Sequence, residues 1–165
     1  MARVALRRLV NYLRGNPTEV AVHPYPHHYQ TSANAEETGL VAIKAPDLPT
    51  LESAPPAQFG GPGDRWSPET LLVAAATDCF VLTFRAIARA SKLPWRRLSC
   101  SGEGTLDRVE GVTCFTALAL HAELVIPADV NPDRADRLLQ KAERGCLVSR
   151  SLALEPTLTS SVHHE

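Results

Sequence analysis

The sequence is poor in groups that would bind a metal or cross-link a small fold. It has four cysteines among 165 residues, and they form no CxxC pair and no Cys/His finger spacing. This scarcity excludes a disulfide-rich secreted scaffold, and we expect neither a metal nor another cofactor. It also favours a reducing, cytoplasmic setting, in which a functional cysteine usually acts through its reactivity.

An excess of charge of one sign and a long apolar run are missing as well. The 17 Lys and Arg residues nearly balance the 18 Asp and Glu residues, so the formal net charge of -1 gives no attraction for a polyanion, and we expect no nucleic-acid partner. The longest uninterrupted apolar run, Leu71 to Ala76, is far shorter than the roughly 20 residues that span a bilayer, so we expect no membrane span. Hydrophobic residues make up 44% of the chain, which is enough for the core of one soluble domain.

We divide the chain into a basic extension, residues 1–23, and a single domain, residues 24–165. Four arginines in the extension predict a short basic helix, either solvated or bound to a membrane surface or a partner. The stretch 17–64 is rich in proline, so it supports only short strands, expected at 29–33 and 40–44.

A long helix is predicted from Pro68 to about Ala90. Ser67 is a suitable N-cap, Pro68 suits the first helical position, and Glu69 complements the positive end of the helix. Small and apolar residues recur along it at three- and four-residue spacing, which favours close packing on another element. The helix is so apolar that one domain of this size is not expected to cover it alone, which suggests a second copy of the chain.

The C-terminal half predicts a hairpin, a second helix and a last strand. The hairpin strands are expected at 98–107 and 112–126, the helix from Asn131-Pro132 to Gly145, and the last strand at 152–160. This order of elements is typical of an α+β protein rather than of alternating βαβ units. We predict two central helices enclosed by antiparallel strands.

Two cysteine-containing segments resemble those of the OsmC/Ohr family, the osmotically inducible and organic hydroperoxide resistance proteins. The run WSPETLLVAAATDCF at 66–80 is similar to the central helix of that family, and CLVSRSL at 146–152 is similar to its second cysteine motif. The resemblance extends from about Tyr29 to the end of the chain. It implies the fold of that family, built as an intertwined homodimer.

The resemblance also implies a thiol peroxidase that reduces organic hydroperoxides and is recycled by a small thiol or dithiol. Cys79 would be the peroxidatic nucleophile and Cys146 the resolving thiol, while Cys100 and Cys114 would be bystanders. We therefore predict that Cys79 and Cys146 lie close enough to form a disulfide, with Cα atoms within about 7 Å or a short local shift away. Cys79 is expected to be the more covered of the two.

Such chemistry requires a thiolate, and a free cysteine with a pKa near ~8.5 is mostly protonated at neutral pH. A cation and an apolar peroxide pocket are therefore expected beside Cys79. In the family, an arginine from a strand ahead of the helix supplies the charge and is held by the glutamate that Glu69 matches, but this sequence has no arginine from position 15 to 64. Either the thiolate is less activated or another group substitutes, and the candidates are Arg65, which we prefer, Lys44, and the pair His27 and His28.

Glu69 raises a question of geometry. It lies ten residues before Cys79, which on a helix corresponds to about 15 Å of rise and about 80° around the axis, so the two side chains cannot touch within one helix. Either a long cationic side chain spans this gap, or Glu69 acts on the thiol of the partner subunit, or it only completes the helix N-terminus.

Two functions from different classes stay open. The two motif cysteines favour the peroxidase. The missing arginine favours a thiol module of the same fold that is not a peroxidase and binds a small electrophile or a thiol carrier.

Overall fold

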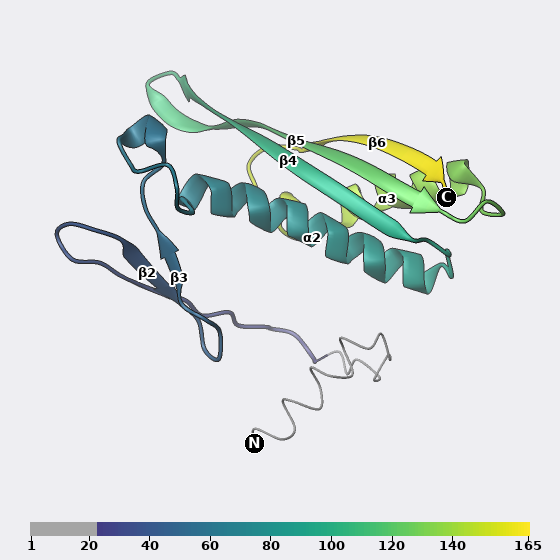
Figure 1. Ribbon diagram of the computed structural model, residues 1–165, viewed down its shortest axis with the longest axis horizontal. Coiled ribbons are helices and arrows are strands. Elements are labelled where there is room, and N and C mark those ends of the chain that lie inside the picture. The colour runs from purple at the N-terminus through teal and green to yellow at the C-terminus, as the bar shows by residue number, and fades with distance from the viewer. Residues whose placement is uncertain (1–22) are drawn as a thin grey trace.

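The computed structural model describes residues 23–165, and the predicted basic helix lies outside them. The described chain begins with a small antiparallel sheet of β1 (Ser32–Asn34), β2 (Val41–Lys44) and β3 (Leu51–Ser53), in that order. Figure 1 shows this sheet standing apart from the rest of the protein, near the start of the long helix. The sheet is joined to the rest of the protein just before that helix, where the N–H of Ala54 donates to the carbonyl of Trp66 at 2.9 Å. The sequence predicts strands close to β1 and β2 but not β3.

The body consists of two helices and a second three-stranded sheet. Its elements are α2 (Pro68–Ala90), β4 (Arg97–Val109), β5 (Val112–Ile126), α3 (Pro132–Gly145) and β6 (Thr157–His164), with short 3-10 turns η1 (Ala57–Phe59) and η2 (Ser149–Ser151). The sheet order is β4-β5-β6, and both helices pack against it (Figure 1). The predicted α+β class is confirmed.

One pair of strands departs from the predicted antiparallel arrangement. Residues 119–126 of β5 pair with residues 157–164 of β6 in parallel. The cause is α3, which carries the chain back along the sheet, so that β6 runs in the same direction as β5. β6 also begins later than the predicted residue 152, because the segment after α3 first forms η2.

The start of α2 is fixed by a reciprocal cap. The hydroxyl of Ser67 accepts from the N–H of Thr70 at 3.2 Å, and the N–H of Ser67 donates to the hydroxyl of Thr70 at 2.8 Å. Two of the helix-end donors that would lack an intrahelical partner are satisfied in this way. The helix ends at Ala90, and both ends agree with the prediction.

The core lies between the sheet and the inner faces of the two helices. Phe80 and Phe84 of α2 are fully buried, as are Leu120 and Leu124 of β5 and Leu139 of α3. Burial of side chains of this size contributes about 1.5–3 kcal/mol each. This core fixes α2 and α3 against each other.

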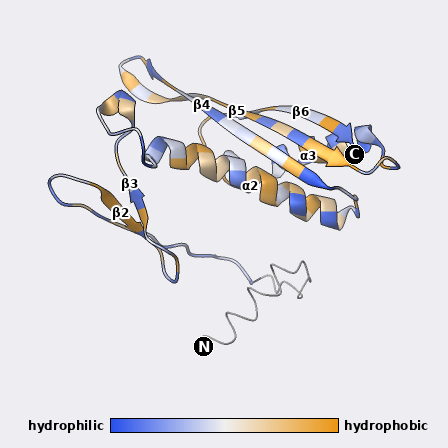
Figure 2. Ribbon diagram, in the orientation of Figure 1, coloured by the Kyte–Doolittle hydropathy of each residue, from blue (hydrophilic) through white to orange (hydrophobic). Residues whose placement is uncertain are grey.

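The opposite side of α2 is much less covered. Ala75, Cys79, Leu82 and Ala86 follow one another at spacings of four, three and four residues, so they form one stripe along the helix, and Leu82 is 45% exposed. We call these four residues the apolar stripe; Figure 2 shows hydrophobic residues recurring along α2. By length and composition α2 is apolar enough to cross a membrane. Its inner face nevertheless packs like that of a core helix, and 22% of its most apolar 18-residue stretch is buried. The described part of the chain therefore leaves an apolar helix face without a cover.

Candidate active site

The structure brings Cys79 and Cys146 together. Cys79 lies in the middle of α2, and Cys146 directly follows the last residue of α3. The thiol of Cys146 donates to the carbonyl of Ala76, one turn before Cys79, at 3.9 Å, and it also forms a hydrogen bond with the sulfur of Cys79. Both thiols are free. The packing of α3 on α2 thus joins two residues that lie 67 positions apart, while their disulfide stays a prediction.

Several donors surround the sulfur of Cys79 and lower the pKa of its thiol. Partial burial raises this pKa, but hydrogen bonds from the backbone of Val148, the thiol of Cys146, the hydroxyl of Thr83 and the backbone of Leu147 together outweigh burial. The hydroxyl of Thr83 lies 4.0 Å from the sulfur. Donors aimed at a sulfur favour its charged form, so Cys79 is disposed to ionise.

Cys146 is disposed in the opposite way. Its pKa is raised, chiefly by burial and further by the neighbouring Cys79. Ser149 acts against this, and its buried hydroxyl has no other hydrogen-bond partner in the part of the chain that the structure describes. The site therefore pairs a thiol that ionises readily with one that retains its proton. The expectation that Cys79 is the more covered thiol is wrong: Cys146 is fully buried at the junction of α3 and η2, whereas Cys79 stands on the half-open stripe of α2.

No cation is among the groups that set the pKa of Cys79 within the described residues. Arg65 instead contacts the carboxylates of Asp64 at 3.0 Å and Glu52 at 4.0 Å. Lys44 is exposed on β2, and His27 stacks on Tyr25 with ring centroids 4.6 Å apart. Arg65, Lys44, His27 and His28 are thus not among the groups that set the pKa of Cys79 in the described part of the chain, and their activating roles stay predictions.

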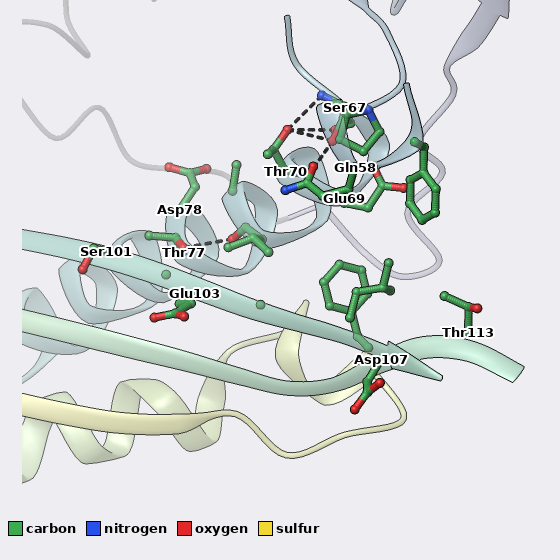
Figure 3. Close-up of a pocket in the computed structure, with 18 of the residues that line it drawn as sticks. Gln58, Ser67, Glu69, Thr70, Thr77, Asp78, Ser101, Glu103, Asp107 and Thr113 are labelled. Carbon is green, nitrogen blue, oxygen red and sulfur yellow. Dashed lines mark hydrogen bonds between the residues drawn. The ribbon is translucent and has the colours of Figure 1, made fainter. Parts of the chain in front are cut away.

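A large cavity of about 1080 Å³ opens between α2, the β4–β5 hairpin and η1 (Figure 3). Its lining includes the apolar side chains of Val73, Val81 and Phe115 and does not include Cys79 or Cys146. The cavity consequently lies on another side of α2 from the thiols, and it is not the peroxide pocket that was expected to flank Cys79.

Glu69 lies on the wall of this cavity, near Gln58 and the helix start (Figure 3). Its Oε2 atom is buried and has no hydrogen-bond partner among the described residues. A buried carboxylate oxygen without a partner is unfavourable, so Glu69 has an unused capacity to accept a hydrogen bond or to pair with a cation.

Three residues that contact Cys79 were not identified from the sequence. Thr83 lies four residues after Cys79 and so on the same side of the helix, which is the one signal that could have pointed to it. The backbone donors of Leu147 and Val148 have no signature in their side chains, because they depend on how the chain turns after Cys146.

Comparison with known proteins places this arrangement among relatives. Residues 61–161 match the profile of the family described as OsmC-like protein. The uncharacterized protein YmaD of Bacillus subtilis is 28% identical over 131 residues, which cover 76% of this chain and 87% of that protein. The peroxiredoxin OsmC of Escherichia coli is 29% identical over 92 residues, which cover 56% of this chain and 64% of OsmC.

The fold agrees with solved structures of the same group. The crystal structure of an organic hydroperoxide resistance protein OsmC from Legionella pneumophila superimposes with a TM-score of 0.65 at 24% identity, covering 84% of this chain and 98% of that one. The family match spans more than half of the sequence and contains both Cys79 and Cys146. The chain therefore belongs to the OsmC-like protein family.

Proposed function

We propose that this protein is a thiol-dependent peroxidase that reduces organic hydroperoxides, with Cys79 as the peroxidatic residue and Cys146 as the resolving residue. The OsmC/Ohr family is associated with cysteine-based peroxidase activity. The observation that carries the proposal is the contact between two thiols whose pKa values are moved in opposite directions, that of Cys79 down and that of Cys146 up. Such a pair provides a nucleophile and, next to it, a protonated thiol for the second step.

The proposed reaction has three steps, which are oxidation of Cys79, closure of the disulfide and its reduction. The thiolate of Cys79 attacks the terminal peroxide oxygen, the O–O bond breaks, and a sulfenic acid and an alcohol form once the leaving alkoxide takes up a proton. Cys146 loses its proton as its sulfur attacks the sulfenic sulfur, which releases water and leaves a disulfide. An external dithiol, or two thiols, reduces the disulfide by exchange and returns both cysteines.

The surroundings of Cys79 suit an organic hydroperoxide. Cys79 lies within the apolar stripe, between Ala75 and Leu82, and an alkyl or aryl group bound there would be removed from water once a second copy covers the stripe. The Legionella pneumophila protein of the same fold is named an organic hydroperoxide resistance protein, which agrees with this substrate class. A cytoplasmic setting, with its reducing thiol pool, would supply the reductant.

The active form is proposed to be a homodimer in which a second copy covers the apolar stripe. A two-fold axis brings the same stripe of both chains together, so that Cys79 would lie next to the partner. The unpartnered Oε2 of Glu69 supports this assembly, because it leaves a carboxylate available to hold a cation near a thiol of the other subunit. Arg65 remains the preferred cation.

A second candidate is a thiol module of the same fold that binds an electrophile or a thiol carrier without reducing peroxides. The absence of a cation among the described groups acting on Cys79 favours it, because the thiolate would then be less activated. The two candidates make different demands on Cys146, since only the peroxidase needs it to resolve a sulfenic acid.

Peroxide consumption by the purified protein tests the proposal. With cumene hydroperoxide and dithiothreitol, we expect the wild type to consume peroxide, and Cys79→Ser to reduce the rate to that of the uncatalysed reaction. Cys114→Ser serves as the matched control because Cys114 is exposed and belongs to neither motif. After one equivalent of peroxide without reductant, the wild type should lose two thiols per chain and Cys146→Ser only one. A wild type that leaves the peroxide intact would reject the peroxidase and favour the thiol module.

A further inference from the structure

We propose that Thr83 is a positioning residue for the reactive thiol, whose hydroxyl donates a hydrogen bond to the sulfur of Cys79 and holds it as a thiolate. The consequence for peroxide reduction rests on the proposed function. The interaction with the sulfur does not, because it can be measured without any peroxide.

The position of Thr83 on α2 places its hydroxyl beside the sulfur. Residues four apart on a helix lie on the same side, one turn from each other. The Oγ1 of Thr83 lies 4.0 Å from the Sγ of Cys79, at the long end of contacts to sulfur. A charged acceptor shortens and strengthens a hydrogen bond, so this contact should tighten when Cys79 ionises.

A second threonine of the same helix shows that this placement is not the ordinary one. Thr77 directs its hydroxyl to the carbonyl of Val73, four residues earlier, at 2.9 Å (Figure 3). This is the usual bond of a threonine within a helix. The hydroxyl of Thr83 lies against a side chain of the same helix instead, where it is available to the sulfur.

The two branches of the Thr83 side chain face different neighbours. A Cβ atom built on Gly145 would lie 3.5 Å from the methyl carbon of Thr83, so the methyl of Thr83 faces the end of α3. A threonine in a helix chooses between two rotamers, and rotation to the other one would carry both the methyl and the hydroxyl group to new positions. The rotamer in the structure therefore places the methyl towards the end of α3 and the hydroxyl at Cys79.

The other groups around Cys79 include no cation in the described part of the chain, so a neutral hydrogen-bond donor matters for stabilising its thiolate. On the side of α3 and η2, the titratable group that acts on Cys79 is the thiol of Cys146, and the other donors are the backbone groups of Leu147 and Val148. No cation contributes among the described residues. The thiolate is therefore held by hydrogen bonds rather than by an opposite charge, and Thr83 supplies the side-chain hydroxyl among them.

The test uses a protein in which Cys79 is the sole cysteine, obtained by replacing Cys100, Cys114 and Cys146 with serine. In that background, Thr83→Val removes the hydroxyl at nearly constant shape, Thr83→Ser retains it, and Thr77→Val is the matched control on the same helix. The thiolate absorbance is titrated, and the rate of alkylation by iodoacetamide is measured over the same pH range. Far-UV circular dichroism checks that each variant folds.

We expect Thr83→Val to raise the pKa of Cys79, and Thr83→Ser and Thr77→Val to leave it near that of the parent. Below this pKa, alkylation of Thr83→Val should be about threefold slower. Loss of one hydrogen bond to a charged group lowers the thiolate fraction about tenfold, and the higher intrinsic nucleophilicity of a more basic thiolate offsets about 0.4–0.5 of that decade. Above the pKa, the order should reverse, so the two pH–rate curves should cross.

Three results would overturn the proposal: an unchanged titration of Thr83→Val, a shift that Thr77→Val reproduces, or a shift that serine does not reverse. If the valine variant fails to fold, the comparison of Thr83→Ala with Thr83→Ser decides in the same way. A protein that does not reduce peroxides yet shows the crossing curves would reject the proposed function and retain the role of Thr83 towards the sulfur.

Discussion

Cys100 lies on β4 among the residues that line the cavity, and burial raises the pKa of its thiol from 9.0 to about 11. An unfolded chain would ionise this thiol near pH 9, so between pH 9 and 11 the native state binds more protons at Cys100 than the unfolded state does. Stability must therefore fall as the pH rises through this window, and the contribution of the protonated thiol is complete only below it.

This linkage predicts a measurable difference between two cysteine variants. We expect the urea midpoint of the wild type to fall between about pH 8 and about pH 10.5, and Cys100→Ala to show a smaller fall. Cys114→Ala, at an exposed position, should follow the wild type. Equal falls in all three proteins would mean that Cys100 does not contribute to the alkaline loss of stability.

At the residue scale, the two motif cysteines could be predicted, whereas the donors around them could not. Sequence similarity pointed to Cys79 and Cys146, and the helical period put Thr83 on the side of Cys79. The period does not decide which branch of a threonine faces the sulfur, because that depends on the rotamer, whose methyl faces Gly145 of α3 in the structure. The greater burial of Cys146 likewise follows from the packing of α3 and η2, which cannot be predicted from the local sequence around Cys146.

At the element scale, the start of α2 depends on the reciprocal bonds between Ser67 and Thr70. Ser67→Ala should reduce the free energy of unfolding by about 1 kcal/mol, which lowers the Tm of a domain of this size by about 2–4 °C. Thr70→Val should also destabilise the protein, because it removes the acceptor for the N–H of Ser67.

A double-mutant cycle checks this prediction. Each single change already disrupts the same cap, so the double variant should lose less than the sum of the two single losses. Thermal denaturation at one fixed chain concentration provides the measurement, since the Tm of an oligomer depends on concentration. Strictly additive losses would show that the two side chains stabilise the helix start independently.

Elements with strong local signals were predicted closely, and those that depend on distant partners were not. The bounds of α2 follow from its cap and its periodicity, and β5 follows from regular alternation. β3 has three residues, too few for a period, and it exists because β2 offers it an edge. The direction of β6 depends on α3 crossing the sheet, which the composition of the strand does not reveal.

At the scale of the whole molecule, the proposed homodimer predicts that Glu69 and Cys79 of different chains serve one site. Glu69→Ala and Cys79→Ser are each expected to be inactive as pure dimers, because each lacks one half of the site. Heterodimers should regain up to one working site of the two, that is, about half of the wild-type activity per dimer. Light scattering at micromolar concentration must first show that the wild type is a dimer.

The heterodimers can be verified by different affinity tags on the two variants. Activity recovered in them would show that Glu69 acts across the interface. Verified heterodimers without activity would exclude the shared site, and a monomeric wild type would exclude the dimer itself.

The segment that follows α3, residues 146–148, stabilises the thiolate of Cys79 and also supplies the thiol that forms the disulfide. It cannot do both at the same moment. Before the reaction, the backbone groups of Leu147 and Val148 hold the charge on Cys79, and the adjacent Cys146 keeps its proton. In the proposed cycle, Cys146 loses that proton when the disulfide closes, and the disulfide ties the same segment to α2. The hydrogen bonds that prepare the thiolate are therefore lost in the same step that uses it. The same stretch of chain would thus first activate the thiol and then be held by the disulfide. An external thiol would have to reduce that disulfide before the next turnover could begin.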